Sequence, residues 1–300
     1  MLRAFDDVLA RVQARTTPKR VGVVAAIDAN SIEAVLKAKE EKIVEPVLIG
    51  DRKKIVAIFD ELNVAEDFEI VDVPDIREAA VKAVEMVHSK EIDFLMKGKI
   101  ETADLLKAVV DKEKGIRTGR LMTHVVFDEV PTYHKLFITT DGGMVMYPDV
   151  EQKKQIIENA VEVMHMLGYA QPKVACLAAI ERVNPKMTET VDADMLKQMN
   201  QEGKITGCIV EGPISFDLAF SREVAVLKGY DSPVAGDADI FLVPNITAGN
   251  ILGKTLVTAA GGKMAGFIYG AQVPIILTSR ASSAEEKYLS LAMASLIEME

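Results

Sequence analysis

Short apolar runs alternate with helical patterns along the whole chain. The last run, Ile275 to Leu277, is apolar on both faces, which is typical of a strand buried between helix layers. Strands are predicted at residues 21–27, 47–49, 69–73, 94–96, 121–127, 136–139, 174–179, 207–210, 240–243, 265–269 and 274–277. Helices are predicted near the N-terminus, at residues 31–42, 76–88, 103–112, 150–167, 193–200, 218–227 and 251–260, and after the last strand. This alternation predicts an α/β fold with mainly parallel sheets.

A domain boundary is indicated near Asp141-Gly142-Gly143, where a strand-like run ends in two glycines. Asp149 then caps a long predicted helix. A chain of 300 residues suits one large or two medium domains; we expect two, and we place the return crossing near Gly261-Gly262. The predicted first domain therefore comprises residues 1–142 and 263–300, and the second comprises residues 143–262.

The charge balance restricts the partners that this protein can bind. The chain carries 35 basic and 45 acidic residues, a formal net charge of −10. So acidic a protein is not expected to bind nucleic acid or an anionic membrane over a broad surface, and any bound phosphate must meet a local basic cluster. The hydrophobic fraction of 49% suffices for a buried core, and no apolar run reaches the length of a membrane span. The N-terminal pattern is an amphipathic helix rather than a signal peptide, which predicts a cytoplasmic protein.

Cysteine and histidine spacing gives no sign of a metal site. Cys176 and Cys208 lie singly in strand-like runs, so buried free thiols are the expected interpretation. The four histidines show no metal-ligand spacing. We expect no protein-bound metal and no permanently bound cofactor.

The turn after the last predicted strand is the first candidate for chemistry. Ser279 and Arg280 follow that strand directly and precede a helix that Ser282 or Ser283 can cap. The carboxyl end of a buried strand is where open α/β sheets bind ligands, and arginine holds phosphate through two parallel hydrogen bonds. The alternative is structural, because serines followed three residues later by Glu285 and Glu286 also fit the capping box.

Three other loops stand between a predicted strand and a predicted helix. In the first, Gly98 follows Lys97 and lets the backbone approach a ligand, while Thr102 can cap the helix; the alternative is a solvated turn. The second, Glu211-Gly212-Pro213 with Asp217, is interpreted as a tight turn before a helix cap. The third joins Asp231-Ser232-Pro233-Val234-Ala235-Gly236 to a segment from Pro244 to Asn250, and is either a ligand contact or only a loop.

Two nucleotide-binding motifs are absent or incomplete. Gly249 to Thr255 ends in Gly-Lys-Thr, but only three residues separate its glycines where a phosphate-binding loop requires four. The chain also contains no GxGxxG pattern, which weakens a dinucleotide-dependent interpretation.

Taken together, the loops resemble the phosphate acetyltransferase and phosphate butyryltransferase family. The matching stretches keep the family's order over nearly the whole chain, and Leu277-Thr278-Ser279-Arg280-Ala281 with Val183-Asn184-Pro185-Lys186-Met187 is more similar to the butyryl branch. The resemblance implies two α/β domains with an interdomain cleft, as in isocitrate and isopropylmalate dehydrogenases, and a homodimer or higher homo-oligomer. It also implies reversible acyl transfer between coenzyme A and inorganic phosphate, with acyl-CoA, phosphate and acyl phosphate as partners.

The resemblance further implies roles for single residues. Arg280 would bind the phosphate of the substrate, Ser279 would orient or polarise the reacting carbonyl, and Glu286 would deprotonate the thiol, with Glu285 as the alternative base. Relatives generally carry arginine where this chain has Lys107, so Lys107, Arg117 or Arg120 would contact a phosphate of coenzyme A. The remaining residues of the matching stretches that we expect to bind substrate are Lys97, Gly98, Thr102, Asp217, Ser232, Pro233, Gly249 and Asn250.

Three other functions remain open. The protein could be a phosphate acetyltransferase, because acetyl and butyryl differ by only two methylenes and the sequence does not identify the residues that line the acyl pocket. A non-catalytic protein of the same fold would bind acyl phosphate or coenzyme A as a signal. A nicotinamide-dependent dehydrogenase of similar architecture would require carboxylates for a divalent metal, for which Asp217, Asp237 and Asp239 are the nearest candidates.

Overall fold

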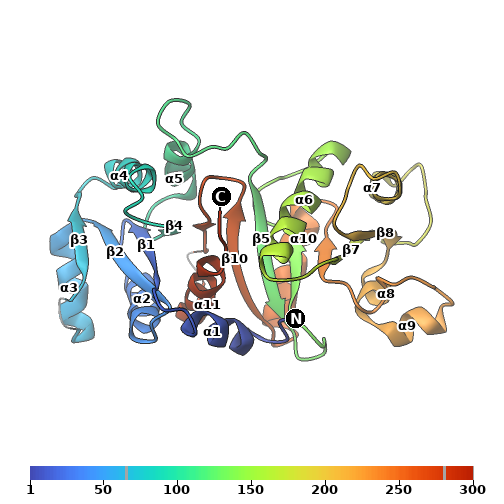
Figure 1. Cartoon of the computed structure of the whole chain (residues 1–300), viewed down its shortest axis with the longest axis horizontal. Helices are drawn as coiled ribbons and strands as arrows, with labels where there is room; N and C mark the ends of the chain where they lie inside the picture. Colours follow the sequence, from blue (N-terminus) through green and yellow to red (C-terminus); the bar gives the residue numbers. More distant parts are fainter. Residues whose placement is uncertain (65–66, 280–281, 300) are drawn as a thin grey trace. The chain divides into compact units, whose positions relative to one another are not determined.

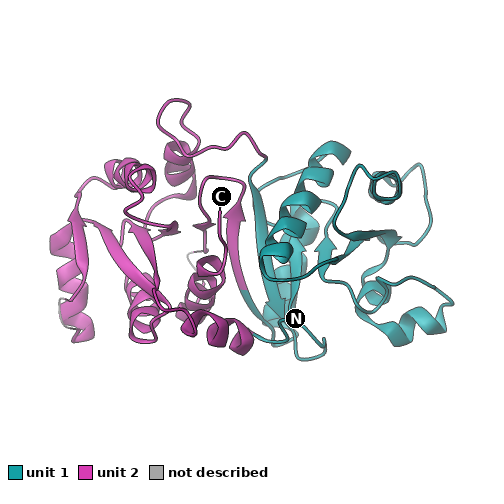
Figure 2. Cartoon of the chain, viewed as in Figure 1, with its two compact units in different colours: residues 1–4, 121–264 teal, residues 5–120, 265–300 magenta. Residues whose placement is uncertain are grey.

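The chain forms two units, which Figure 2 shows in separate colours. The computed structural model describes residues 1–64, 67–279 and 282–299. Unit 1 comprises residues 1–4 and 121–264, and unit 2 comprises residues 5–120 and 265–300. Arg280, the predicted phosphate ligand, lies outside the described residues.

The strands of unit 2 follow the order β3-β2-β1-β4-β11-β10 (Figure 1). Neighbouring strands from β3 to β11 are parallel, and β10 is antiparallel to β11. From β1 the chain builds outward on one side and then returns to the other side with β4. The order therefore reverses between β1 and β4, at the kind of switch point where open α/β sheets bind ligands. The bounds are β1 Lys19–Val24, β2 Val44–Gly50, β3 Glu69–Asp72, β4 Phe94–Lys97, β10 Lys263–Tyr269 (from Ala265 in unit 2) and β11 Ile275–Ile276.

Side-chain caps fix where most helices of unit 2 begin. Asp28, Asp51, Asp75 and Ser283 each accept a hydrogen bond from a backbone N–H in the first turn of the following helix. Each of these helices follows a strand, so its N-terminus lies at the carboxyl end of the sheet. The bounds are α1 Phe5–Gln13, α2 Ala29–Glu40, α3 Arg52–Leu62, α4 Ile76–His88, α5 Thr102–Val109 and α11 Ala284–Ser295.

The strands of unit 1 follow the order β5-β6-β9-β7-β8. β5 and β6 are antiparallel, and the remaining neighbours are parallel. An aromatic cluster of Tyr133, Phe137, Phe216, Phe220 and Phe241 fills the core beside the sheet. The bounds are β5 Thr123–Glu129, β6 Phe137–Thr140, α6 Val150–Met166, β7 Lys173–Leu177, α7 Thr188–Gln201, β8 Ile209–Ile214, α8 Phe216–Phe220, α9 Arg222–Leu227, β9 Ile240–Leu242 and α10 Ile246–Thr258.

The predicted α/β fold with mainly parallel strands is confirmed, and α4 has the predicted bounds. One helix, α3, was not predicted. It buries Ile55 and Phe59, which are four residues apart on one face, but its first turn begins with three basic residues that obscure the apolar period. The predicted helix at residues 218–227 is divided at Ser221, which caps α9.

Two predicted loops of unit 1 are regular structure instead. Glu211-Gly212-Pro213, predicted to be a tight turn, lies inside β8; a Cβ on Gly212 would come within 2.7 Å of the Cys176 Cβ, so glycine permits close strand packing. The segment predicted as a loop up to Asn250 is helical from Ile246, because Asn245 accepts the Ala248 N–H and starts α10 early.

The division of the chain differs from the predicted domains. The first crossing lies between residues 120 and 121 rather than 142 and 143, and the return lies between residues 264 and 265 rather than 262 and 263. β6 carries the predicted boundary sequence at its end but pairs with β9, so both β5 and β6 belong to unit 1. The glycines that follow β6 serve a turn inside that unit.

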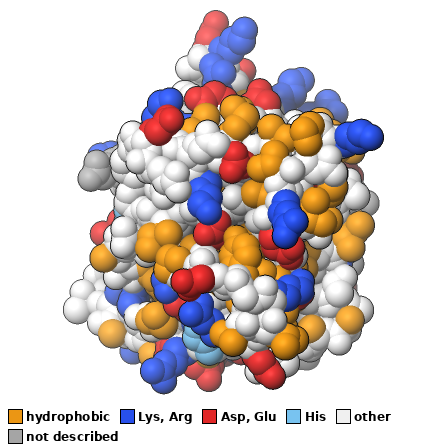
Figure 3. Space-filling view, turned by 90° about the vertical axis from the view of Figure 1, so that its right-hand side faces the viewer, with side chains coloured by type: hydrophobic (Ala, Val, Ile, Leu, Met, Phe, Trp, Pro, Cys, Tyr) orange, Lys and Arg blue, Asp and Glu red, His pale blue; other side chains and the backbone are white. Residues whose placement is uncertain are grey.

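One face of the molecule carries side chains of both charges. On the face drawn in Figure 3, basic, acidic and hydrophobic side chains are interspersed. No helix within the described part of the chain is long and apolar enough to cross a membrane.

Candidate functional site

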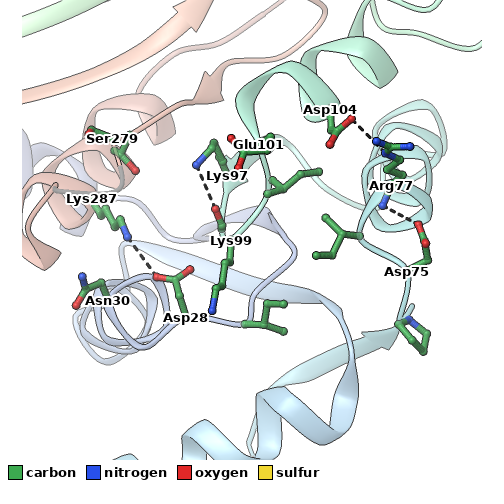
Figure 4. Close-up of a pocket in the computed structure, with 16 residues that line it drawn as sticks. Asp28, Asn30, Asp75, Arg77, Lys97, Lys99, Glu101, Asp104, Ser279 and Lys287 are labelled. Carbon is green, nitrogen blue, oxygen red and sulfur yellow. Dashed lines mark hydrogen bonds and ion pairs between the residues drawn. The ribbon is translucent and has the colours of Figure 1, made fainter.

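A pocket of about 860 Å³ lies at the carboxyl ends of the parallel strands of unit 2. Loops after β1, β3, β4 and β11 form its walls, so it occupies the switch point of the sheet. Figure 4 shows Ser279 and Lys287 at one end, Lys97, Lys99 and Glu101 in the middle, and Arg77 with Asp75 at the other end. The lining side chains include four bases, Arg77, Lys97, Lys99 and Lys287, and four acids, Asp28, Asp75, Glu101 and Asp104.

Two of the predicted substrate-binding residues, Lys97 and Gly98, line this pocket. Lys97 is the last residue of β4, is 7% exposed, and donates a hydrogen bond to the Gly98 carbonyl at 3.4 Å. A Cβ on Gly98 would lie 2.4 Å from the Ala25 carbonyl oxygen. The close approach that requires glycine is therefore to the backbone after β1, in addition to any approach to a ligand.

Thr102 does not cap α5, contrary to the prediction. It is the first residue of the helix; the N-cap is Glu101, whose side chain makes no capping hydrogen bond. Thr102 is exposed and is not among the described residues that line the pocket.

Lys107 lies in a second pocket, of about 310 Å³, between α4 and α5. Arg77 and Asp104 line both pockets and form an ion pair of 3.2 Å, so this pair stands where the two cavities adjoin. Arg117 and Arg120 are exposed in the segment after α5 and belong to neither lining among the described residues.

The start of α11 combines a structural cap with a perturbed carboxyl group. Ser279 lines the pocket, and Ser283 accepts the Glu286 N–H at 3.1 Å. The side chain of Ser282 donates to Glu286 Oε1 at 2.7 Å. Burial raises the pKa of Glu286 above its usual value, although the Ser282 hydrogen bond and the charge of Lys287 act in the opposite direction.

Neither Glu285 nor Glu286 is among the described residues that line the pocket. Glu286 is half-buried and Glu285 is exposed. The capping interpretation of this turn is thus correct for Ser283, and Ser279 separately faces the pocket. A chemical role for either glutamate stays a prediction.

Sequence reasoning missed several residues of the pocket, of which Lys287 and Asp28 are the most notable. Lys287 is 5% exposed, and its Nζ donates to Ser31 Oγ at 3.1 Å and to Asp28 Oδ1 at 3.4 Å. The position of Asp28 just before a predicted helix was an available signal. Lys287 lies in a run of helix-forming residues, so the sequence gave no signal that it lines a pocket.

The other predicted substrate-binding residues belong to unit 1. Asp217 lies in the first turn of α8, accepts a hydrogen bond from Ser215 at 2.5 Å and pairs with Lys228 at 2.9 Å; these two contacts lower its pKa. Ser215, not Asp217, is the N-cap of that helix. Ser232 is buried and Pro233 is exposed.

Gly249 and Asn250 lie within α10 rather than in a loop. A Cβ on Gly249 would come 2.6 Å from the Gly142 Cα, so the two glycines let two backbones approach, as their composition suggested. Asn250 is exposed on the same helix.

The carboxylates proposed for a dehydrogenase metal are paired with basic side chains instead. Lys135, which is buried, bonds Asp239 at 2.6 Å and Asp237 at 2.8 Å, and Lys173 also pairs with Asp237. Burial alone would raise the pKa of Asp237, but hydrogen bonds from Lys135, Lys173 and His134 outweigh it and hold that pKa well below its usual range. These ion pairs disfavour the dehydrogenase hypothesis. No group of three or more potential metal ligands occurs among the residues that the structure describes.

The two cysteines are free and buried, as predicted. Burial raises the pKa of Cys208 to about 12 and raises that of Cys176 further above the usual range. Both side chains are therefore thiols at neutral pH and are poor nucleophiles.

Comparison with known proteins identifies the family. A sequence model described as "Phosphate acetyl/butaryl transferase" matches residues 74–295. The chain belongs to this family. It is 42% identical over 298 residues to the phosphate butyryltransferase of Clostridium acetobutylicum, with 99% of each chain covered. It is 47% identical over 284 residues to the phosphate acetyltransferase of Thermotoga maritima, with 94% of this chain and 96% of that protein covered.

A solved structure agrees with this assignment to the phosphate acetyl/butyryl transferase family. The crystal structure of a branched-chain phosphotransacylase from Enterococcus faecalis superposes with a TM-score of 0.82 at 32% identity, covering 93% of this chain and 99% of that chain. The predicted family and enzyme class are confirmed: the protein is an acyltransferase of the phosphate acetyl/butyryl transferase family.

Proposed function

We propose that this protein transfers a short acyl group reversibly between coenzyme A and inorganic phosphate, and that butyryl or a similar short or branched chain is its substrate. The observation that carries the proposal is Ser279 in a pocket at the switch point of the sheet, with Lys97 and Lys287 buried in the same walls, in a chain of this family. Buried cations favour the anionic phosphate and thiolate that the reaction brings together.

The reaction needs a thiolate and a carbonyl whose leaving group is stabilised. In the direction of acyl-CoA formation, the sulfur of coenzyme A forms a bond to the acyl carbon, the bond from that carbon to the phosphate oxygen breaks, and phosphate leaves with the electron pair. Ser279 would orient the carbonyl, and Arg280 would neutralise the phosphate. No covalent acyl-enzyme is required, because both substrates can bind at once and their orientation supplies much of the rate.

Glu286 is our proposed base for the thiol proton. With ordinary pKa values, moving a proton from a thiol to a glutamate spans about 4.2 pH units and costs about 5.7 kcal/mol. Burial raises the pKa of Glu286, which narrows this gap. Such a raised value supports Glu286 over Glu285, which is exposed.

The second pocket supports the proposed contact of Lys107 with coenzyme A. That pocket adjoins the first at the Arg77–Asp104 pair, and its lining includes Lys107 and Lys114. A long substrate with its thiol near Ser279 would extend toward α4 and α5, where these lysines can neutralise a phosphate. Lys97, Gly98 and Thr102 are proposed to contact the substrate on the way.

We also propose that the residues of unit 1 that resemble family substrate contacts, Asp217, Ser232, Pro233, Gly249 and Asn250, bind substrate. We further propose that the protein is cytoplasmic and forms a homodimer or a higher homo-oligomer. Sedimentation of the purified protein tests the oligomeric state.

A thiol-release assay tests the function and the chain length together. The protein is mixed with phosphate and, in turn, acetyl-, propionyl-, butyryl- and isobutyryl-CoA. We expect the highest kcat/KM with butyryl-CoA or isobutyryl-CoA, and release that depends on phosphate.

The same assay discriminates the alternatives. Preference for acetyl-CoA would make the protein a phosphate acetyltransferase, which its 47% identity to the Thermotoga maritima enzyme favours as the second candidate. Absence of phosphate-dependent release with every thioester would contradict catalysis and favour a protein that only binds acyl phosphate or coenzyme A.

A further inference from the structure

Lys287 is a buried cation in the wall of the pocket, and its contacts point to a more specific role than a general attraction of anions. It is 5% exposed and lies one residue after Glu286, in the first turn of α11. A lysine is almost never this buried without a partner that compensates its charge. Its nearest partners from another element are Ser31 Oγ at 3.1 Å and Asp28 Oδ1 at 3.4 Å.

Both partners belong to the start of α2. Asp28 is the N-cap of that helix and accepts the Ser31 N–H at 2.9 Å with the same Oδ1 atom that faces Lys287. Ser31 is completely buried. The ammonium group therefore ties the loop after β1 to the beginning of α11, and both segments are walls of the pocket (Figure 4).

We propose that Lys287 is a positioning residue for acyl transfer: its ammonium group fastens the start of α2 to the first turn of α11, which carries Glu286, and places a positive charge next to that residue in the chain. The inference rests on the proposed function, because it assigns Lys287 to act through the proposed base. Asp28 is the ion-pair partner of Lys287, so its negative charge should offset part of the effect of Lys287 on Glu286.

The described charged groups around this junction come from α1, α2 with its caps, and α11. Glu286 itself is bonded by Ser282 and is influenced by the adjacent Lys287. The ionisable groups that face the first turns of α11 from α2 are Asp28, Lys37 and Glu41, the last two through contacts with Tyr288. On α1, the charge of Asp6 raises the pKa of Tyr288. On α11 itself, Glu285 is the residue next to Glu286. Of these groups, Lys287 lowers the pKa of Glu286 by its charge.

Two substitutions are predicted to move the pH profile in opposite directions. In Lys287→Met the positive charge is lost, so the pKa of Glu286 should rise and the acid limb of the kcat/KM profile should move to higher pH. In Asp28→Asn the cap is retained, because asparagine caps helices as well as aspartate, but the negative partner of Lys287 is lost. The acid limb should then move to lower pH.

The experiment measures these limbs in the full-length protein with the best acyl-CoA of the panel. We expect Lys287→Met to lower kcat/KM at neutral pH at least tenfold. Lys287→Arg keeps the positive charge, so its acid limb in the pH profile should stay at the wild-type position. Lys54→Met, which removes an exposed lysine paired with Asp51 in the same unit, is the control and should leave the profile unchanged.

A second readout needs no activity. Carboxyl resonances of 13C-labelled glutamate are titrated in the wild-type protein and in both variants, and Glu286→Gln identifies the signal of Glu286. An upward shift in Lys287→Met together with a downward shift in Asp28→Asn supports the proposal even if every thioester fails in the assay. Failure of the proposed function is thereby separated from failure of this inference.

A purely structural role gives a different result. If Lys287→Met and Lys287→Arg both lower the unfolding midpoint while the Glu286 titration stays at its wild-type position, the inference is overturned. It is equally overturned if Lys287→Met retains wild-type kcat/KM and pH dependence.

Discussion

Single side chains around the pocket often have a structural contact and a candidate chemical role at once. Glu286 occupies the third position of α11, where its N–H is capped by Ser283, and its carboxylate accepts a hydrogen bond from Ser282. Its burial raises its pKa, whereas the exposed Glu285 beside it lacks that environment. Two adjacent glutamates with such different surroundings can be distinguished by experiment.

Glu286→Gln should lower kcat about 10²–10⁴-fold and remove the acid limb of the pH–rate profile, because a glutamine cannot accept the thiol proton. The raised pKa of Glu286 means that the base is lost as the pH falls through a value above the ordinary 4.5 of glutamate. The wild-type limb should therefore lie above pH 4.5. Glu285→Gln is the matched control and should keep both the rate and the limb; equal behaviour of the two variants would contradict the assignment.

Arg280→Ala should reduce kcat about 10²–10³-fold, since it removes a preorganised donor to the phosphate. Arg280→Lys should recover only part of the loss, because lysine keeps the charge without the two parallel hydrogen bonds. Steady-state rates are compared with the urea midpoint of each variant. Near-normal turnover of Arg280→Ala would refute the phosphate role.

At the scale of an element, α10 shows how local packing overrides a loop-like composition. Asn245 caps the helix, so residues that look like a turn in sequence become its first turns. Gly249 then faces Gly142 so closely that no side chain fits between the two backbones. A Cβ on Gly253, one turn later, would meet only the flexible end of Met264, with its Cε at 3.4 Å.

Gly249→Ala should lower the free energy of unfolding by about 1–3 kcal/mol, because its methyl group would force apart two backbone segments. Gly253→Ala in the same helix should be neutral or stabilising by up to about 1 kcal/mol, as alanine favours helix over glycine. Urea denaturation of both variants checks this contrast. A Gly249→Ala protein as stable as Gly253→Ala would show that the glycine contact is not tight.

At the scale of the whole molecule, each unit has its own core and its own network of polar contacts. In unit 1, Lys135 is completely buried and neutralises Asp237 and Asp239, which both lie just before β9. Its ammonium also donates to the Asp237 carbonyl at 2.9 Å. This network joins the loop before β6 to the loop before β9.

Lys135→Met should destabilise the protein by about 3–5 kcal/mol, because Asp239 would remain buried without its cation. Lys154→Met, which breaks a partly exposed pair with Glu158 on α6, should change the unfolding free energy by about 0.5 kcal/mol or less. Chemical denaturation followed by circular dichroism measures both. Equal effects would mean that the Lys135 network contributes nothing beyond a surface pair.

The Asp237 carboxyl should also add acid sensitivity. Its pKa in the folded protein is lowered from 3.8, so its stabilising contribution is fully present above that value and is lost as the pH falls toward the folded pKa. Stability measured below pH 3.8 should therefore decline less steeply in Lys135→Met than in the wild-type protein.

The sequence by itself determined the α/β class, the mainly parallel strands and the positions of most elements, because periodicity and capping residues act over a few neighbouring positions. It also predicted that the loops with Lys97, Gly98 and Ser279 could bind a ligand, since residues at the carboxyl ends of buried parallel strands meet at one edge of a sheet. All three residues line the pocket. The family resemblance depended on the same local strings.

Tertiary structure alone decided which distant segments share a pocket and what each polar group faces. Lys287 and Asp28 are far apart in the chain, and nothing local to either residue indicates their contact. The same holds for Gly142 with Gly249 and for Lys135 with Asp239, whose partners are chosen by strand order. Burial, and with it the raised pKa of Glu286, is likewise a property of the packed molecule, because desolvation depends on every element that covers the group.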